Sequence, residues 1–430
     1  MSKLLIKNAT VIPMTGQAKM ITNGEIAIEG NKIAFVGPKG TVPADWAASE
    51  IIDATGMVAM PGFVNCHTHA AMTLLRSYAD DMPLMQWLSE RIWPLEERLT
   101  GEDVYWGTML CILEMIKSGT TTFADMYFFM DDVAKAVEQT GIRACLSRGM
   151  VGVNPTAQRA LDETGEFVEK WKGAAEGRIT TMVGPHATFT CPPDYLKKVM
   201  NIALRSNVGV HIHVAETRPE VDDIRKLYGK TPVEYLNDVG LLDFPVLAAH
   251  CVHLTQNDIK ILKEKNVGVA HNPESNMKLS SGIAPVPQML AEGINVGLGT
   301  DGAASNNNLD MMEEMRSAAL LHKVNSGDPT TIPSYTALEM ATINGGKVIG
   351  LDIGVLQPGF KADVILIDFE KPHLYPRHDI VAHTVYAAQS SDVDTVIIDG
   401  KVLLRKGQVT TMDEKEILYK VQRCANRVVK

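Results

Sequence analysis

The chain has 430 residues, and 45% of them are hydrophobic, so it is long enough to bury one large core and a smaller one. Its formal net charge is −10, and no run of Lys or Arg is long enough to follow a phosphate backbone. We therefore expect one large and one small domain, and we do not expect a nucleic-acid polymer as a partner.

The cysteines and the apolar segments indicate the compartment. The six cysteines are dispersed without CxxC spacing, a pattern that favours reduced thiols over a secreted disulfide framework: Cys66, Cys111, Cys145, Cys191, Cys251 and Cys424. The first residues lack a sustained apolar core with a cleavage site, and no later stretch reaches the roughly 18 apolar residues of a membrane span. These features predict a cytoplasmic protein with no membrane contact.

The two ends of the chain share a β-rich texture. Residues 3–58 contain short apolar runs separated by turn residues, and the last seventy residues repeat this pattern in ADVILIDF and VDTVIIDGKVLLRKGQV. The second of these runs contains an Asp-Gly hairpin signal. Neither end is long enough to fold alone, so we predict that 1–58 and 360–430 pair into one small, discontinuous β-sandwich domain.

Residues 59–359 have a different rhythm, in which short apolar runs alternate with amphipathic helical stretches. Eight candidate strands can be counted: 58–65, 120–126, 143–148, 179–187, 209–216, 246–252, 267–273 and 296–302. An open doubly wound sheet could give a similar rhythm. A (β/α)8 TIM-type barrel is favoured because polar residues cluster at the carboxyl ends of many different strands.

The first candidate strand ends in a pair of histidines. His67 and His69 lie two residues apart in GFVNCHTHAAM, and alternate side chains of a strand point to the same side. Both imidazoles can therefore face one metal ion. The alternative for this motif alone is two histidines that hydrogen-bond in a polar barrel mouth.

The fifth candidate strand carries a second set, in HIHVAET. We assign His213 as a metal ligand because it lies nearer the carboxyl end than His211, which we expect to be packed or hydrogen-bonded. Glu216 follows the strand and is a candidate proton carrier.

The sixth and eighth candidate strands end in His250 and Asp301. A carboxylate beside a metal-activated water can ligate the ion and accept a proton, and a neighbouring histidine can stabilise developing negative charge. His253 and His271 have weaker claims, because the first lies beyond its strand and the second can line the mouth without reacting. An Asp-Gly pair alone is commonly a turn, but these motifs fall on strands one, five, six and eight of an independently counted set.

Several motifs resemble one known family: the segment from PGFVNCHTHAAM to WPLE, then HVAET, AAHCVHLT, HNPESNMKLSSGIAPV and GLGTDGAASNNNLDM. Together they are similar to the amidohydrolase superfamily, and specifically to its 5′-methylthioadenosine/S-adenosylhomocysteine deaminase branch, over essentially the whole chain. The resemblance implies a distorted (β/α)8 barrel with one divalent metal per subunit, usually Zn²⁺ and sometimes Fe²⁺. The ligands it implies are His67, His69, His213 and Asp301.

The same resemblance implies roles for the remaining site residues. Glu216 would shuttle protons, protonating the purine N1 as hydroxide attacks C6, and His250 would orient the attacking water. Glu216 or Asp301 would then pass a proton to the departing amine, and both would also contact the substrate. Glu96 would bind the ribose hydroxyls, Arg148 and His186 would bind other parts of the substrate, and the match for Arg159 is looser.

We therefore predict the hydrolytic deamination of 5′-methylthioadenosine and S-adenosylhomocysteine, with adenosine as a further candidate, to the inosine analogues and ammonia. The alternative is a nucleobase deaminase or a triazine chlorohydrolase on the same scaffold. A binuclear ring-opening hydrolase would need a lysine at the end of the fourth strand, and ITTMVGPHA contains none. A non-enzymatic scaffold would be expected to lack some of these residues. The expected partner is a small nucleoside, and a homo-oligomer remains open.

Overall fold

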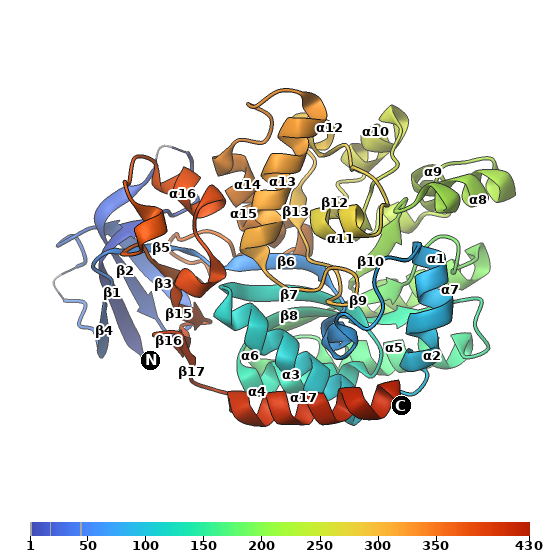
Figure 1. The fold of residues 1–430 in the computed structure, drawn as a ribbon, viewed down its shortest axis with the longest axis horizontal. Helices are drawn as coiled ribbons and strands as arrows, with labels where there is room; N and C mark the ends of the chain where they lie inside the picture. Colours follow the sequence, from blue (N-terminus) through green and yellow to red (C-terminus); the bar gives the residue numbers. More distant parts are fainter. Residues whose placement is uncertain (1, 18, 44) are drawn as a thin grey trace.

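The computed structural model describes residues 2–17, 19–43 and 45–430, and its central element is a parallel barrel. Eight strands form one sheet in the order β13-β12-β11-β10-β9-β8-β7-β6, with helices around it (Figure 1). The first and last strands also lie in contact, and just after β13 the Asp301 amide donates to the carbonyl of His67 in β6 at 2.9 Å. The predicted (β/α)8 fold is confirmed. Its strands are β6 (Phe63–Thr68), β7 (Thr120–Tyr127), β8 (Arg143–Met150), β9 (Ile179–Pro185), β10 (Gly209–Val214), β11 (Val246–His250), β12 (Gly268–His271) and β13 (Val296–Leu298).

The predicted strand 58–65 is wrong in its extent, because it is divided between two sheets. Met57–Pro61 forms β5 of a separate sheet, and the barrel strand β6 begins at Phe63. Both pieces are almost entirely buried, so the apolar pattern gives no sign that the strand changes partner at Gly62.

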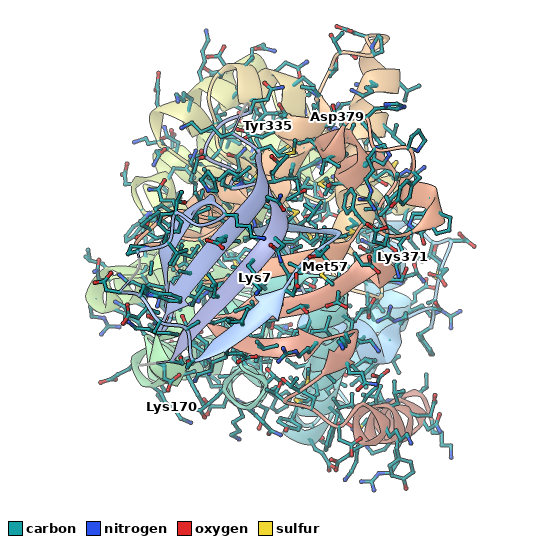
Figure 2. All side chains as sticks on the ribbon, turned by 90° about the vertical axis from the view of Figure 1, so that its left-hand side faces the viewer. Lys7, Met57, Lys170, Tyr335, Lys371 and Asp379 are labelled. Carbon is teal, nitrogen blue, oxygen red and sulfur yellow. The ribbon has the colours of Figure 1, made fainter. Side chains whose placement is uncertain are left out.

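Both ends of the chain form the separate mixed sheet, in the order β17-β16-β15-β14-β5-β1-β2-β3, with β4 paired to β1. The antiparallel pair β5 and β14 joins the two ends, and Figure 2 shows the blue amino-terminal strands beside the red carboxyl-terminal ones. Hydrogen bonds connect these nine strands, so the two chain ends share one small, discontinuous β unit, as predicted. These strands are β1 (Lys3–Val11), β2 (Ile21–Glu29), β3 (Lys32–Pro38), β4 (Glu50–Asp53), β5 (Met57–Pro61), β14 (Val364–Asp368), β15 (Val393–Ile398), β16 (Lys401–Arg405) and β17 (Gln408–Val409).

Helices surround the barrel, and several begin at side-chain caps. Thr100 and Asp103 form a capping box at the start of α3, and Thr255 and Asp258 form another at α10. The α-helices are α1 (Leu84–Trp87), α2 (Trp93–Glu96), α3 (Gly101–Lys117), α4 (Met130–Thr140), α5 (Ala157–Trp171), α6 (Ala174–Gly177), α7 (Pro193–Ser206), α8 (Arg218–Tyr228), α9 (Pro232–Asp238), α10 (Gln256–Glu264), α11 (Pro273–Lys278), α12 (Val286–Ala291), α13 (Met311–Ser326), α14 (Ser334–Ala341), α15 (Ile343–Ile349), α16 (Ile380–Tyr386) and α17 (Glu414–Val429). Shorter helical turns are η1 (Ala70–Leu75), η2 (Leu88–Ile92), η3 (Leu241–Asp243), η4 (Pro372–Leu374) and η5 (Ser390–Asp392).

The last segment of the chain returns to the barrel. Helix α17 runs beside α3 (Figure 1), where Lys117 and Glu414 form an ion pair at 2.9 Å. The segment after residue 360 therefore supplies helices to the barrel as well as strands to the small sheet. All six cysteines are buried free thiols. Within the described ranges, no helix has the length and apolarity needed to cross a bilayer.

A buried ion cluster joins the barrel to the small sheet. Arg143, at the start of β8, donates to Asp363 at 2.8 and 3.0 Å and to Asp399 at 3.0 Å. No side chain of this cluster is more than 3% exposed. Loss of the guanidinium would leave two carboxylates buried without their main counter-charge.

Arg143→Leu is therefore expected to lower the free energy of unfolding by about 3–5 kcal/mol, measured by urea-induced unfolding. The matched control is Lys401→Met, which removes the exposed ion pair between Lys401 and Glu176 and should change the stability little. Similar losses in the two variants would contradict a structural role for the buried cluster.

Candidate active site

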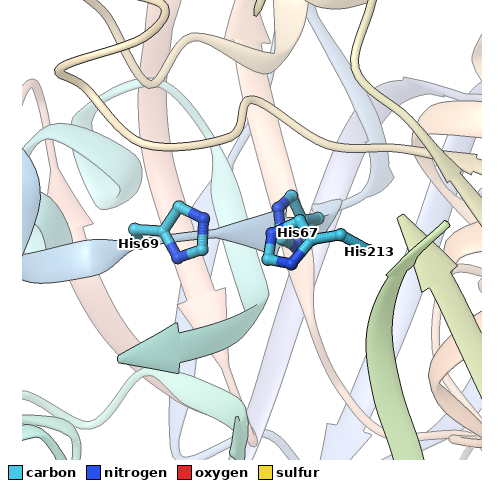
Figure 3. A group of neighbouring side chains, drawn as sticks. All are labelled: His67, His69 and His213. Atoms are coloured by element: carbon cyan, nitrogen blue, oxygen red, sulfur yellow. The ribbon is translucent and has the colours of Figure 1, made fainter. Parts of the chain in front are cut away.

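The histidines predicted from the sequence meet at the carboxyl ends of the barrel strands. His67 lies on β6, His69 follows it, and His213 lies on β10; Figure 3 shows the three rings close together. The ligand atoms of these three residues lie within 4.8 Å of one another. The same holds for His67, His250 and Asp301. Both groups could hold a metal ion.

Hydrogen bonds to backbone carbonyls fix two of the imidazoles. His69 Nδ1 lies 2.6 Å from the Met126 carbonyl oxygen, and His213 Nδ1 lies 2.6 Å from that of His186. A carbonyl oxygen can only accept, so each Nδ1 carries the hydrogen and each Nε2 keeps its lone pair. These two Nε2 atoms are therefore available as ligands.

His67 and Asp301 offer two further atoms that could bind a metal ion. Among the described residues, the buried His67 Nε2 has no hydrogen-bond partner. Asp301 Oδ1 lies 3.4 Å from His67 Nε2 and 3.3 Å from His69 Nε2. An orphaned imidazole nitrogen beside further nitrogens and a carboxylate is the donor set that a divalent metal prefers in proteins.

Hydroxyl groups hold the Asp301 carboxylate in one orientation. Its Oδ2 accepts hydrogen bonds from Ser275 Oγ at 2.7 Å and from Ser305 Oγ at 2.9 Å. The Gly302 amide donates to Oδ1 at 2.8 Å. Oδ1 is consequently the oxygen that faces the histidines.

Three residues at or near this site have left-handed backbone conformations. Ala215, His250 and Asp301 have φ values of +50°, +73° and +59° at the ends of their strands. Such left-handed conformations cost about 1–3 kcal/mol each for residues other than glycine, and they commonly occur at functional sites. Gly299 allows β13 to approach β6, because a Cβ there would lie 2.9 Å from the His67 amide nitrogen.

Glu216 and His250 lie beside the cluster and influence each other's charge. Their side chains approach to 3.8 Å between Oε2 and Nε2. Burial raises the pKa of Glu216 above that of an ordinary glutamate. Burial opposes the charged form of His250, but the carboxylates of Glu216 and Asp301 outweigh it and raise the pKa of that imidazole. Both shifts favour the protonated form of the group concerned.

Three members of the cluster, His69, His213 and Asp301, line one cavity, and His67 lies next to them outside its lining. Glu96, from α2, and His186, after β9, both line this cavity together with His69, Glu216, His250 and Asp301. Much of the remaining wall is apolar or aromatic: Met72, Leu84, Trp87, Leu88, Ile92, Trp93, Phe128, Val151, Phe189 and Leu279. The cavity therefore suits a molecule with polar groups at one end and apolar surface elsewhere.

The two predicted arginines share Glu163 as their ion-pair partner. Arg148 Nη2 donates to Glu163 Oε2 at 2.7 Å, and its guanidinium carbon lies 5.7 Å from the centre of the Phe128 ring. Arg159 Nε donates to the other Glu163 oxygen at 2.6 Å. In the described chain, the cavity wall includes Phe128 but neither arginine.

The remaining histidines have separate partners. His253 Nε2 bonds the Ser281 carbonyl oxygen at 2.7 Å, and His271 Nε2 lies 3.2 Å from His322 Nε2. Neither residue lines the cavity in the described chain. His211 lies much nearer, with its Nε2 2.8 Å from His67 Nδ1.

Comparison with known proteins identifies the family. Residues 58–403 match the model of the amidohydrolase family. This chain belongs to the amidohydrolase family. A 5-methylthioadenosine/S-adenosylhomocysteine deaminase of Pelotomaculum thermopropionicum is 64% identical over 430 residues, which cover 100% of this chain and 99% of that protein. The predicted resemblance to this deaminase branch is confirmed.

Two further proteins resemble this amidohydrolase over its full length. A 5′-deoxyadenosine deaminase of Methanosarcina mazei is 51% identical over 431 residues, with 100% of this chain and 99% of that protein covered. A crystal structure of an adenosine deaminase from Xanthomonas campestris with bound zinc is 33% identical, with a TM-score of 0.96 and coverage of 100% and 99%.

Sequence reasoning missed several residues that support the site of this amidohydrolase. Ser275 and Ser305 lie inside the motifs HNPESNM and GAASNN but received no role, because a serine in a loop has no characteristic spacing. Glu220, four residues after Glu216, accepts a hydrogen bond from the Glu216 amide at 2.8 Å and another from Thr188. The available signal was the Thr217–Glu220 spacing, which is typical of a helix start with a capping threonine.

Proposed function

We propose that this amidohydrolase is a metal-dependent deaminase of 5′-methylthioadenosine and S-adenosylhomocysteine that releases ammonia and the inosine analogue, with adenosine as a further candidate. The observation that carries the proposal is the cluster of His67, His69, His213 and Asp301, of which the last three line a cavity together with Glu216 and His250. The names of the similar deaminases support the substrate class.

The four residues of this cluster would hold one divalent cation, which we propose is Zn²⁺, with Fe²⁺ as the second choice. Three imidazole nitrogens and one carboxylate suit either ion, and the similar adenosine deaminase structure contains zinc. A bound cation would supply Lewis acidity and make a water nucleophilic at neutral pH.

The chain's own residues would then move the protons. Glu216, whose pKa is raised by burial, would place a proton on N1 of the purine as the water oxygen bonds to C6. Asp301 Oδ1 would accept one proton from that water and pass it to the exocyclic amine, which leaves as ammonia. The second proton of the water would return to Glu216 as the C6 carbonyl forms. His250, 3.8 Å from Glu216, would orient the water and stabilise the developing oxyanion.

The cavity wall supports the placement of the nucleoside. Glu96 would accept hydrogen bonds from the ribose hydroxyls, and His186 would donate to the purine. The aromatic rings of Trp93, Phe128 and Phe189 would cover the apolar substituent at the 5′ position.

A substrate panel tests the proposal. The purified protein with zinc is given 5′-methylthioadenosine, S-adenosylhomocysteine, adenosine, guanine and a chlorotriazine, and the release of ammonia or chloride is measured. We expect ammonia from the 5′-substituted adenosines and much slower turnover of guanine and the triazine, since neither has a ribose for Glu96. Absence of ammonia release from every adenosine derivative would overturn the proposal.

A separate experiment tests whether Arg148 binds substrate, because its guanidinium already donates two hydrogen bonds to Glu163. A carboxylate on the 5′ substituent would have to compete with Glu163 for Arg148 and Arg159. Glu163→Gln is expected to raise kcat/KM for S-adenosylhomocysteine about fivefold relative to methylthioadenosine, which has no carboxylate. The control is Asp162→Asn, which changes a neighbouring carboxylate that accepts a hydrogen bond from Gln158. An equal change in kcat/KM for both substrates would show that Arg148 does not bind the substrate carboxylate.

A further inference from the structure

One proposed metal ligand is oriented differently from the other two. His69 and His213 donate directly to backbone carbonyls, but His67 Nδ1 faces another imidazole nitrogen, Nε2 of His211, at 2.8 Å. His211 lies on β10 two residues before His213 and is completely buried. Because either ring could donate across this contact, the contact alone does not fix which nitrogen of His67 carries the hydrogen.

The hydrogen bonds beyond His211 remove this ambiguity. Ser147, on β8, has its Oγ 3.0 Å from His211 Nδ1 and 2.7 Å from the Asp125 carbonyl oxygen. The carbonyl can only accept, so it takes the single hydroxyl hydrogen of Ser147. Ser147 Oγ must therefore accept from His211, and His211 Nδ1 carries a hydrogen.

The donor and acceptor roles at His211 also determine those at His67, the proposed metal ligand. A neutral His211 has one N–H, which is used at Ser147, so its Nε2 accepts from His67 Nδ1. His67 Nε2 is left with a free lone pair, and this is the buried atom that has no partner among the described residues and lies 3.4 Å from Asp301 Oδ1. The opposite direction would place a hydrogen on Nε2, where it would prevent ligation.

We propose that Ser147 and His211 are positioning residues, which fix His67 in the tautomer that can bind the metal. The inference rests on the proposed role of His67 as a ligand. All three side chains are buried, with 0% exposure, so water cannot easily replace a missing partner. Loss of an outer hydrogen-bond partner of a ligating histidine commonly weakens metal binding about 10- to 100-fold.

The experiment measures zinc affinity directly. Metal-free forms of the wild type and of His211→Leu, His211→Gln, Ser147→Ala and His322→Leu are titrated with zinc in competition with a chromophoric chelator. His322→Leu is the matched control, because it removes one imidazole from the other buried histidine pair, whose Nε2 atoms are 3.2 Å apart. Thermal unfolding of each metal-free variant shows whether it is folded.

We expect His211→Leu to bind zinc about 10- to 100-fold more weakly than the wild type, and Ser147→Ala to bind it several-fold more weakly. His211→Gln should recover most of the affinity, because its amide oxygen can accept from His67 Nδ1, and His322→Leu should bind as the wild type does. Wild-type zinc affinity in folded His211→Leu or Ser147→Ala would overturn the proposed positioning role of Ser147 and His211. An equal loss of zinc affinity in His211→Gln and His211→Leu would overturn it as well. If His211→Leu does not fold, Ser147→Ala and His211→Gln decide the result. A wild-type protein that binds no zinc would instead refute the proposed metal site.

Discussion

Glu216→Gln is expected to lower kcat by about 10²- to 10⁴-fold while the zinc content stays at the wild-type level. Glutamine keeps the size and polarity of the side chain but cannot deliver a proton to the purine N1. Burial raises the pKa of Glu216, so this carboxyl keeps its proton at higher pH than an exposed glutamate, as its role as a proton donor requires.

The two readouts of this variant separate proton transfer from metal binding. Ammonia release gives kcat, and elemental analysis of the purified protein gives the zinc content. Glu234→Gln changes a glutamate that caps α9, and it should leave both values close to those of the wild type. Near-normal turnover by Glu216→Gln would exclude Glu216 as the proton carrier, and loss of zinc would indicate a structural role instead.

Asp301→Asn is expected to have the second large effect, lowering kcat/KM at least about 10³-fold and weakening zinc binding. The carboxylate supplies the only negative charge among the four proposed ligands, and the neutral amide is a poorer ligand and cannot accept a proton. Ser275 and Ser305 would still hold the side chain in place, so the loss would reflect charge rather than position.

Asp310→Asn is the control for this substitution. Asp310 caps α13 nine residues after Asp301, and asparagine caps helices equally well, so zinc affinity and turnover should not change. If Asp301→Asn bound zinc as tightly as the wild type and kept its turnover, Asp301 would be neither a ligand nor a proton acceptor.

The barrel and the main site residues could be predicted because strand geometry makes their pattern local. His67 and His69 are two residues apart, as side chains on one side of a strand are. Glu216 follows shortly after the strand that carries His213, and Asp301 follows an apolar run that is long enough for a strand. Parallel strands then bring their carboxyl ends together. Proximity of these residues therefore follows from counting strands.

Other features could not be predicted, because they depend on contacts between segments far apart in the chain. The division of 58–65 between two sheets is set by the partners β14 and β7, which lie far away in sequence. Arg148 meets Glu163 because α5 packs beside β8, and no local pattern shows this competition with a substrate. The hydrogen bond from His211 to Ser147 likewise joins residues 64 positions apart.

A metal titration tests the central claim, that one metal in a four-residue site drives the deamination of adenosine-type nucleosides. Metal-free protein is titrated with zinc while ammonia release from 5′-methylthioadenosine is measured. The rate should rise linearly from near zero and level off at one zinc per chain. A rate that does not depend on zinc, or that requires two zinc ions per chain, would contradict this account.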